Sequence, residues 1–432
     1  MAYDSFQVLN VKRDLILKPR HITATVRRYK YLYTGIIIFT LMHVYTSMTS
    51  KEEISPHLPV HQPVLERFIN EFHDLATDMF YKSKSPGAAI AIVKNGRIIY
   101  GEGFGVKKVG ENDSIDIHTT FRIASVSKTF AGVLTSKLVN QGELNWEDKV
   151  QKYFPQFELK NPDYAEKMEV RHILSQTTGL IQHAYTNFIE EGKELNTMIA
   201  ALPDVKLMTE PGKLFSYQNV AYGVIEPVLE SVTGRDYATL IKEEIFETLK
   251  MKNASIDYES MVANENIAYP NFPRRGGWTT GKISKTYYNV PSAGGINASI
   301  SDMANYMIAL TGHRPEIVNQ YVLDDIFQPQ VNTNIRWKYF SRWKHYKKSY
   351  YGLGWRIVKN ASSTIAYHGG YVNGYRSQLA INTDEDVGIC ILTNSPTSFS
   401  SKLLPVFLEL YDTYKDQLQI EDNTQISIAY NK

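Results

Sequence analysis

The chain has 432 residues, of which 43% are hydrophobic and 21% charged, and its formal net charge is +2 at pH 7. This composition is typical of a globular protein rather than a disordered one, and without a long basic stripe in the body of the chain we expect no nucleic-acid partner. The single cysteine excludes an intrachain disulfide, and the eleven histidines lack the spacing of zinc sites, so we expect no metal and no other cofactor.

The N-terminal part predicts a membrane anchor. Residues 1–30 contain many Lys and Arg residues, whereas residues 31–50 contain no Asp, Glu, Lys or Arg. About 20 such residues are enough for a helix to cross a bilayer. The positive-inside rule then keeps residues 1–30 in the cytoplasm and places the rest of the chain in the periplasm or outside the cell. A cleaved signal, which would give a secreted protein, and an ordinary buried helix are the alternatives.

The remaining chain is expected to comprise a linker at residues 51–62, a domain at residues 63–418 and a C-terminal tail at residues 419–432. The domain begins with a helical apolar pattern at residues 65–82. Residues 88–105 then predict two strands joined at Asn95-Gly96, a pair that favours a tight hairpin turn because both positions tolerate positive φ.

From about residue 125 to residue 345 the pattern is mostly helical, with Gly- and Pro-rich loops between the helices. Strand patterns return afterwards, each bounded by turn residues, at residues 351–358, 364–370, 375–382 and 386–394. The last of these contains Cys390, which we expect to be buried. Residues 400–418 predict a closing helix with an internal proline.

Strands at both ends of the domain predict one antiparallel sheet, of about five or more strands, that the end of the chain returns to complete. Helices would flank this sheet, and the residues between the two sets of strands would form an inserted, mainly helical lobe. The fold class is therefore α/β in the α+β sense. The cleft between sheet and lobe is the expected place for a site that binds a small molecule or a peptide.

The stretch FRIASVSKTFAGVL, residues 121–134, contains a candidate nucleophile. Ser125 and Lys128 are three residues apart, so on a helix they share one face, about one turn apart. Ser125 would lie at the helix N-terminus, where it could cap the helix and where free N–H groups favour a developing anion. A semi-buried lysine loses its proton more readily and can act as a base. Ser127 would point elsewhere.

The Ser-x-x-Lys spacing is not specific alone, because one or two matches are expected in a chain of this length. A second match, Ser341 to Lys344, occurs in a segment rich in Lys, Arg and Tyr with no helical apolar pattern after it. The alternative interpretation of Ser125 is a helix cap followed by a surface lysine. The apolar pattern that follows Ser125 favours this match over the one at Ser341.

Two further groups would complete an acyl-transfer site. Tyr217-x-Asn219 begins an amphipathic helical pattern after a Pro-Gly turn, and His368-Gly369-Gly370 ends a predicted strand. Two consecutive glycines would let a substrate approach the backbone closely. Each group alone is weak, since other Tyr-x-Asn matches occur and a histidine at a strand end is often structural.

In this order, Ser125-x-x-Lys128, Tyr217-x-Asn219 and His368-Gly369-Gly370 resemble the serine β-lactamase and penicillin-binding-protein superfamily. The phrases LSQTTGL, EPGKLFSYQNVAYGV and SAGGINASISDMANYM add to the resemblance, which covers about residues 60–415. It is closest to the branch of class C β-lactamases, D-aminoacyl peptidases, DD-carboxypeptidases and β-lactamase-like esterases.

The resemblance implies a role for each matching residue. Ser125 would form an acyl-enzyme, and Lys128 would keep its hydroxyl activated. Tyr217 would act as general base for the attack and then as general acid for the leaving group. Asn219 would orient the substrate, and the backbone N–H groups of Ser125 and Tyr371 would form the oxyanion hole.

The third motif departs from the Lys-Thr-Gly of β-lactamases and most penicillin-binding proteins. Histidine at position 368 is mostly neutral at pH 7, whereas lysine is a permanent cation for a substrate carboxylate. Family members with His-x-Gly here are often esterases, peptidases or amidases, so the departure disfavours penicillin hydrolysis. Arg274 or Arg275 could bind a carboxylate instead, although solvated loop charges are the simpler interpretation.

The leading hypothesis is therefore a membrane-anchored serine hydrolase that cleaves an amide or ester, such as a cell-wall peptide containing D-amino acids. The alternatives are a carboxylesterase of the same fold, a true class C-like β-lactamase, and a non-hydrolytic penicillin-binding or sensor protein. The intact set Ser125, Lys128 and Tyr217 favours catalysis over sensing.

Overall fold

A computed structural model describes residues 62–334, 340, 342–343, 346–360 and 363–430, with side chains described as far as residue 424. The predicted cytoplasmic segment, the anchor at residues 31–50 and nearly all of the linker lie outside this part. Among the helices that are described, none has both the length and the apolar character needed to cross a membrane. Residues 62–432 form one compact unit by their internal contacts.

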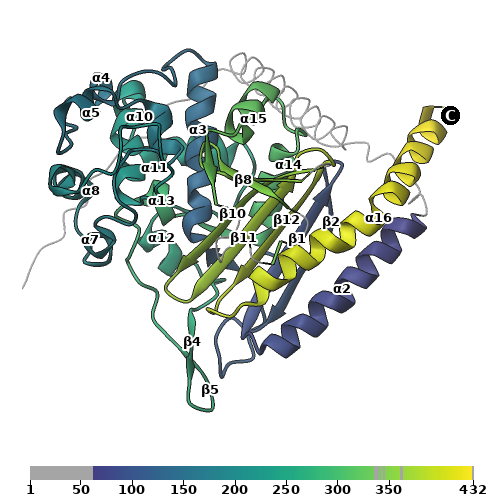
Figure 1. The fold of residues 1–432 in the computed structure, drawn as a ribbon. Coiled ribbons are helices and arrows are strands. Elements are labelled where there is room, and N and C mark those ends of the chain that lie inside the picture. The colour runs from purple at the N-terminus through teal and green to yellow at the C-terminus, as the bar shows by residue number, and fades with distance from the viewer. Residues whose placement is uncertain (1–61, 335–339, 341, 344–345, 361–362, 431–432) are drawn as a thin grey trace, which may run out of the picture. The chain divides into compact units, whose positions relative to one another are not determined.

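The described chain is built on an eight-stranded antiparallel sheet in the order β2-β1-β12-β11-β10-β9-β8-β7 (Figure 1). Its strands are β1 (Gly87–Lys94), β2 (Arg97–Gly105), β7 (Val331–Thr333), β8 (Lys348–Tyr351), β9 (Arg356–Lys359), β10 (Thr364–Val372), β11 (Tyr375–Asn382) and β12 (Val387–Thr393). The two ends of the domain meet where β1 pairs with β12, with Ala91 opposite Cys390. The predicted antiparallel sheet is thereby confirmed, and Cys390 is buried in it.

Two tight turns fix the register of this sheet. Asn95 and Gly96, between β1 and β2, both have positive φ, at 49° and 69°, which is the requirement of a type I′ turn. Asn373 and Gly374, between β10 and β11, likewise have φ of 39° and 91°. A two-residue turn fixes which residues of the two strands pair. The side chains of these strands are therefore each assigned to one face of the sheet.

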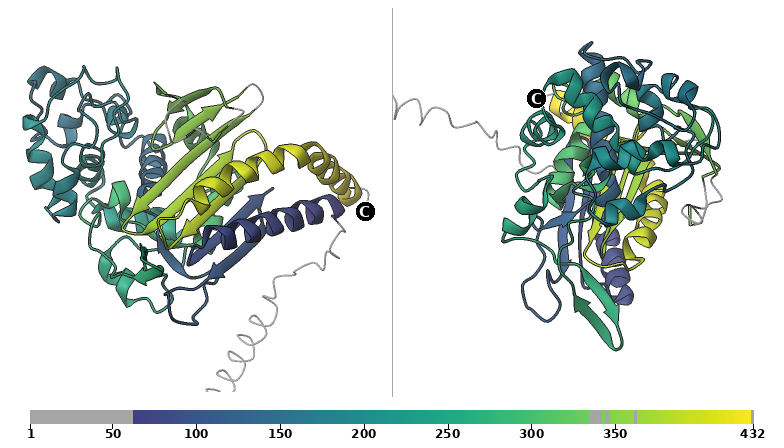
Figure 2. Two further views of the ribbon diagram at one scale, coloured as in Figure 1. Left: turned by 60° about the horizontal axis from the view of Figure 1, so that its bottom comes forward. Right: turned by 90° about the vertical axis from the view of Figure 1, so that its left-hand side faces the viewer.

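One face of the sheet is covered by α2 (Pro63–Ser83) and α16 (Phe399–Tyr430), which lie side by side (Figure 2). Phe68 and Phe72 of α2 pack against Phe407 of α16. The Glu421 carboxylate accepts hydrogen bonds of 3.0 Å from two N–H groups in the first turn of α2. The helix therefore continues past residue 418, into the part that the sequence pattern assigned to a tail.

The other face packs on α3 (Ser127–Asn140) and α14 (Ile300–Leu310), and beyond them lies the inserted lobe (Figure 1). The remaining helices are α4 (Val150–Tyr153), α5 (Pro162–Glu166), α6 (Val170–Leu174), α7 (Thr186–Glu190), α8 (Leu195–Ala200), α9 (Val220–Gly223), α10 (Ile225–Thr233), α11 (Tyr237–Ile241), α12 (Tyr258–Ala263), α13 (Pro291–Gly294) and α15 (Gln320–Phe327). The described residues also form two short 3₁₀ helices, η1 (Ala124–Val126) and η2 (Leu202–Asp204), and a π-helix, η3 (Lys242–Glu247).

The sequence analysis misses several short strands, one just before residue 125 and the others within the mainly helical pattern predicted for residues 125–345. A small sheet joins β3 (Thr120–Arg122) to β6 (Asn297–Ser299), and β4 (Asn271–Arg274) with β5 (Gly277–Thr280) forms a hairpin. Strands of three or four residues are too short to show an alternating pattern. The predicted strand at residues 351–358 is in fact two strands, β8 and β9, separated by a turn in which Gly354 has φ of 85°.

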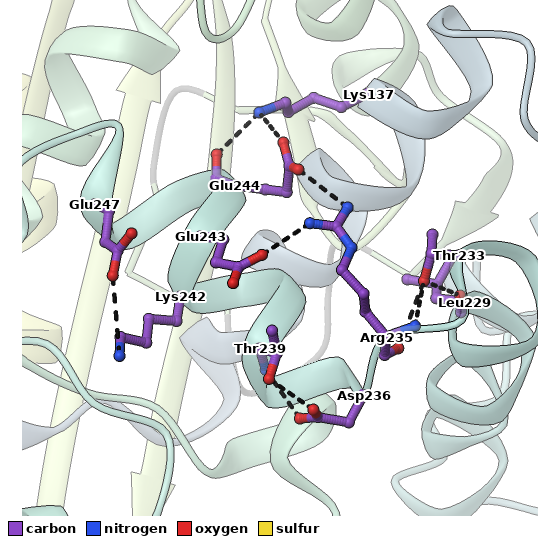
Figure 3. Close-up of polar contacts among 10 residues, drawn as sticks. All are labelled: Lys137, Leu229, Thr233, Arg235, Asp236, Thr239, Lys242, Glu243, Glu244 and Glu247. Carbon is purple, nitrogen blue, oxygen red and sulfur yellow. Dashed lines mark hydrogen bonds and ion pairs between the residues drawn. The ribbon is translucent and has the colours of Figure 1, made fainter.

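An ion-pair network ties the end of α3 to the lobe (Figure 3). The Lys137 ammonium donates to the backbone oxygen of Glu244 at 2.8 Å and lies 3.3 Å from its carboxylate. The Arg235 guanidinium contacts Glu243 at 2.9 Å and Glu244 at 3.1 Å. Because Glu244 has a cation on each side, this end of α3 is held against η3 by paired charges.

Candidate active site

Ser125 lies in η1, between the end of β3 and the start of α3, and is half-buried. Ala124, immediately before it, has φ of 50°, a conformation that costs free energy for a non-glycine residue and is found most often at functional sites. Within the described residues the Ser125 N–H has no hydrogen-bond acceptor. The N-terminal turn of the helix therefore presents an open donor beside the Ser125 hydroxyl.

The expectation that Ser125 also caps the helix is wrong. No side chain caps α3, and its first turn is held by Ser127 instead. The Ser127 hydroxyl donates to the Ala124 oxygen at 2.7 Å and accepts from the Ile296 N–H at 3.1 Å. Ser127 is thus fully engaged in structure, as its predicted direction away from Ser125 implies, and the Ser125 hydroxyl is left for other contacts.

Lys128, one turn after Ser125, is completely buried. Its Nζ atom donates to Asn219 Oδ1 at 2.8 Å and to the Ala293 backbone oxygen at 2.7 Å. Burial, and secondarily the charge of Arg356, hold the pKa of this amine well below its usual range. A neutral amine that donates both of its N–H groups keeps its lone pair free. Lys128 can therefore accept a proton.

Tyr217 and Asn219 lie in the loop that leads into α9, and the fold brings both to Lys128. The Lys128 Nζ atom lies 5.0 Å from the centre of the Tyr217 ring. Asn219 accepts from Lys128 through Oδ1 and donates through Nδ2 to the Tyr287 hydroxyl at 3.0 Å. These contacts fix the orientation of the Asn219 amide and leave one N–H of its Nδ2 group for a substrate.

His368 lies within β10 rather than at its end, and only 1% of its surface is exposed. Its Nδ1 atom is 2.9 Å from the Gly369 oxygen, and its Nε2 atom is 3.2 Å from the Tyr351 hydroxyl. A carbonyl only accepts, so Nδ1 carries the hydrogen and Nε2 accepts from Tyr351. Burial, together with the charge of Arg356, lowers the pKa of His368 well below its usual value. The imidazole is therefore neutral at physiological pH.

Gly370 brings β10 into contact with the segment that carries Ser125. A Cβ atom at this position would lie 2.5 Å from the Ile123 oxygen and 2.9 Å from the Ala124 Cβ atom. The Ser377 hydroxyl of β11 donates to the same Ile123 oxygen at 2.6 Å. Only glycine lets the strand approach this closely. The sheet is thus docked against the residue before the candidate nucleophile, Ser125.

The N–H group of Tyr371 is open on the side of β10 that faces away from β11. The turn at residues 373–374 makes Val372 and Tyr375 the hydrogen-bonded pair, so the next pair, Tyr371 and Arg376, is not hydrogen-bonded. The Tyr371 N–H therefore points outward, and the pairing of β10 with β9 has already ended at Tyr367. The structure leaves the N–H groups of both Ser125 and Tyr371 available for an oxyanion.

We predict that Gly370→Ala will slow acyl transfer about 10²-fold, because displacing the strand by even 1 Å misplaces the Tyr371 N–H. The comparison is Gly101→Ala in β2 of the same sheet, where the nearest atom to an added Cβ is 3.8 Å away. The rate of covalent labelling by an acylating probe should fall only in the first variant, with thermal unfolding followed for both. Equal rates in the two variants would contradict the assignment.

Several residues of the site carry no recognisable signal in the sequence. Arg356 lies 5.3 Å from the centre of the Tyr217 ring and is buried. Tyr287 holds Asn219, and the ring of His183 lies 5.7 Å from that of Tyr217. Arg356 lies in the phrase YGLGWRI, which was predicted as a strand and contributes to the family resemblance, but no role was predicted for Arg356 itself. Its guanidinium is the permanent cation of this region, because His368 is neutral.

Arg274 and Arg275, considered above for carboxylate binding, lie exposed at the end of the β4–β5 hairpin. The base of this hairpin adjoins the β10–β11 turn, where an added Cβ at Gly374 would lie 3.0 Å from Pro270 and 3.2 Å from Phe272. The structure gives these arginines no contact with Lys128, Tyr217 or His368. In the described part of the chain no group of His, Cys, Asp and Glu residues could hold a metal ion.

Comparison with known proteins finds a family and several relatives that this chain resembles in sequence. A family profile described as Beta-lactamase matches residues 65–409. Protein flp of Staphylococcus aureus is 25% identical over 378 residues, which cover 81% of this chain and 69% of that protein. Beta-lactamase-like protein 2 of Dictyostelium discoideum is 22% identical over 367 residues, with coverages of 81% and 64%.

Two solved structures share the fold. The octameric penicillin-binding protein homologue from Pyrococcus abyssi superposes with a TM-score of 0.69 at 22% identity, covering 79% of this chain and 77% of that one. The crystal structure of SurE gives a TM-score of 0.65 at 18% identity, with coverages of 83% and 77%. At these identities the similarity concerns the fold alone.

Proposed function

Because the chain belongs to the beta-lactamase family, we propose that it is a serine hydrolase that cleaves an amide or an ester through an acyl-enzyme on Ser125. The observation that carries this proposal is the state of Lys128, which is buried, donates both N–H groups to fixed oxygens and lies one turn from Ser125. A surface lysine after a helix cap would have none of these contacts.

In the proposed reaction, the Ser125 oxygen attacks the substrate carbonyl carbon and its proton passes to the amine of Lys128, which returns a proton to Tyr217 after Tyr217 has given its own to the leaving group. The negative charge that develops on the carbonyl oxygen is stabilised by the N–H groups of Ser125 and Tyr371, each contributing about 3 kcal/mol. Tyr217 then protonates the leaving amine or alcohol as the carbonyl–leaving-group bond breaks. Water hydrolyses the acyl-enzyme by the reverse use of the same groups.

For the substrate we propose an amide or ester of a small molecule or peptide, such as a cell-wall peptide that contains D-amino acids. A carboxylesterase is the second candidate, and the buried, neutral His368 favours it over a β-lactamase because this position lacks the lysine cation for a substrate carboxylate. Export of the catalytic domain across the cytoplasmic membrane remains part of the proposal, supported by residues 31–50 and the basic residues before them.

The experiment that tests this function treats the purified full chain with a fluorophosphonate and, separately, with a fluorescent penicillin, and maps each adduct by mass spectrometry. We expect the fluorophosphonate on Ser125. An adduct confined to another residue, or no adduct, would overturn the proposed function. Labelling by fluorophosphonate without penicillin favours the esterase or amidase, and turnover of a short ester against a D-Ala-D-Ala peptide separates these two. A penicillin adduct that persists without any turnover would favour the sensor.

A further inference from the structure

A buried carboxyl group lies behind the candidate active site. Glu226 of α10 is only 6% exposed. Its Oε1 atom accepts from the Ser292 N–H at 2.9 Å and from the Ser292 hydroxyl at 2.6 Å. Within the described residues it forms no ion pair with Lys, Arg or His. Burial without a nearby cation favours the protonated carboxyl over the carboxylate, and it outweighs the two accepted hydrogen bonds, which favour the charged form.

Glu226 is connected to Lys128 through a short run of backbone. Ser292 and Ala293 are consecutive residues of α13, and the Ala293 oxygen accepts from Lys128 Nζ at 2.7 Å. On the other side of Lys128, Asn219 is held by Tyr287, whose ring lies 2.9 Å from where a Cβ atom on Gly294 would be. The two acceptors of the lysine are therefore both supported from α13, and Glu226 holds the start of this turn.

We propose that Glu226 in its protonated form is a positioning residue for Lys128, and that loss of its proton at alkaline pH switches off acyl transfer. This inference rests on the proposed function of Ser125 and Lys128. A buried negative charge without a cation is relieved by hydration, which displaces Ser292 and with it the Ala293 oxygen. The same charge favours the ammonium form of Lys128, which cannot take the Ser125 proton.

The surroundings of Glu226 as a whole favour its protonated form. Burial raises its pKa from the usual 4.5 to about 8, the hydrogen bonds from Ser292 oppose this, and the charge of Glu230 on the same helix adds to it. Tyr237 of α11 faces Glu226 with a buried hydroxyl that has no partner in the described residues. Glu244 is the contrast (Figure 3), since Arg235 and Lys137 keep its pKa below the usual value although burial opposes them.

The sign of the stability effect follows from the raised pKa. The unfolded chain loses the Glu226 proton above about pH 4.5, whereas the folded chain keeps it until about pH 8. Between these values the folded state binds more protons, so the stabilisation present below pH 4.5 is lost progressively as the pH rises to 8. Above pH 8 the difference between the two states stays constant.

The test compares wild type with Glu226→Gln and, as a matched control, Glu247→Gln, whose side chain is 60% exposed on η3 (Figure 3). Glutamine accepts the same hydrogen bonds but cannot ionise. The rate of fluorophosphonate labelling of Ser125 should fall about tenfold per pH unit above pH 8 in wild type and in the control. In Glu226→Gln this alkaline limb should move up by at least about one pH unit.

Glu226→Leu, which removes the acceptor, should label slowly at every pH, and glutamine should restore the rate. The melting temperature supplies a readout that needs no activity, because the advantage of Glu226→Gln over wild type should grow between pH 4.5 and 8 and then level off. The same alkaline limb in wild type and Glu226→Gln would overturn the inference. A wild type that reacts at no pH would instead overturn the proposed function, while the melting profiles still report the ionisation of Glu226.

Discussion

Replacing Ser125 with alanine is expected to abolish acyl-enzyme formation and to lower the turnover of a short ester by about 10⁴- to 10⁶-fold. The substitution removes the oxygen that is proposed to form the covalent bond, and within the described residues the Ser125 hydroxyl has no structural hydrogen bond whose loss would unfold the chain. Turnover, fluorophosphonate labelling and thermal unfolding of the full chain measure the effect. We expect the melting temperature to change little.

The neighbouring serine provides the control for this experiment. Ser127→Ala removes two buried hydrogen bonds, to the Ala124 oxygen and from the Ile296 N–H, and should destabilise the fold by about 1–3 kcal/mol. It should nevertheless still be labelled at Ser125. Undiminished labelling of Ser125→Ala, together with loss of labelling in Ser127→Ala, would show that the nucleophile has been assigned to the wrong serine.

The parts of the fold that the sequence predicts well are those with long, uninterrupted patterns. The strand predicted at residues 375–382 coincides with β11, and the hairpin turn at Asn95-Gly96 has the predicted backbone conformation. In both cases local physical chemistry decides the structure: a strand pattern that turn residues bound, and a turn that needs two residues with positive φ. The late strands and the return of the chain to β1 follow from such patterns.

The parts that the sequence does not predict depend on contacts between distant segments. The three-residue strands β3 and β6 exist because residues 120–122 and 297–299 meet in space, and neither segment has a pattern of its own. The C-terminal helix extends to Tyr430 rather than to residue 418, and its Glu421 binds the N–H groups that begin α2. A carboxylate that caps a helix more than 350 residues away leaves no local trace.

Some residues of the candidate site could likewise be predicted from the sequence, and others could not. Ser125, Lys128, Tyr217, Asn219 and His368 could be selected because they occur in ordered motifs. The Ala293 oxygen could not be selected, because it acts through the backbone. Glu226 could not be selected either, because its state depends on its burial. The neutral state of His368 is likewise a product of the fold, since it follows from burial beside Arg356.

Lys128→Met is the second substitution with a large expected effect, a fall in acylation rate of up to about 10⁴-fold. Methionine has a similar volume and fits the buried site, but it offers no lone pair to accept the Ser125 proton. The loss should persist below the alkaline limb of the wild type, because burial keeps the pKa of this amine well below its usual range. Labelling rates from about pH 6 to 8 measure it.

Lys137→Met is the matched control, because it removes a lysine from the same helix. Lys137 contacts Glu244 at the far end of α3 (Figure 3) and takes no part in the site, so its loss should cost about 1 kcal/mol of stability and leave the labelling rate unchanged. If Lys128→Met reacted as fast as this control, Lys128 would be a structural amine that ties Asn219 to Ala293, and the proton of Ser125 would have to pass to Tyr217 directly.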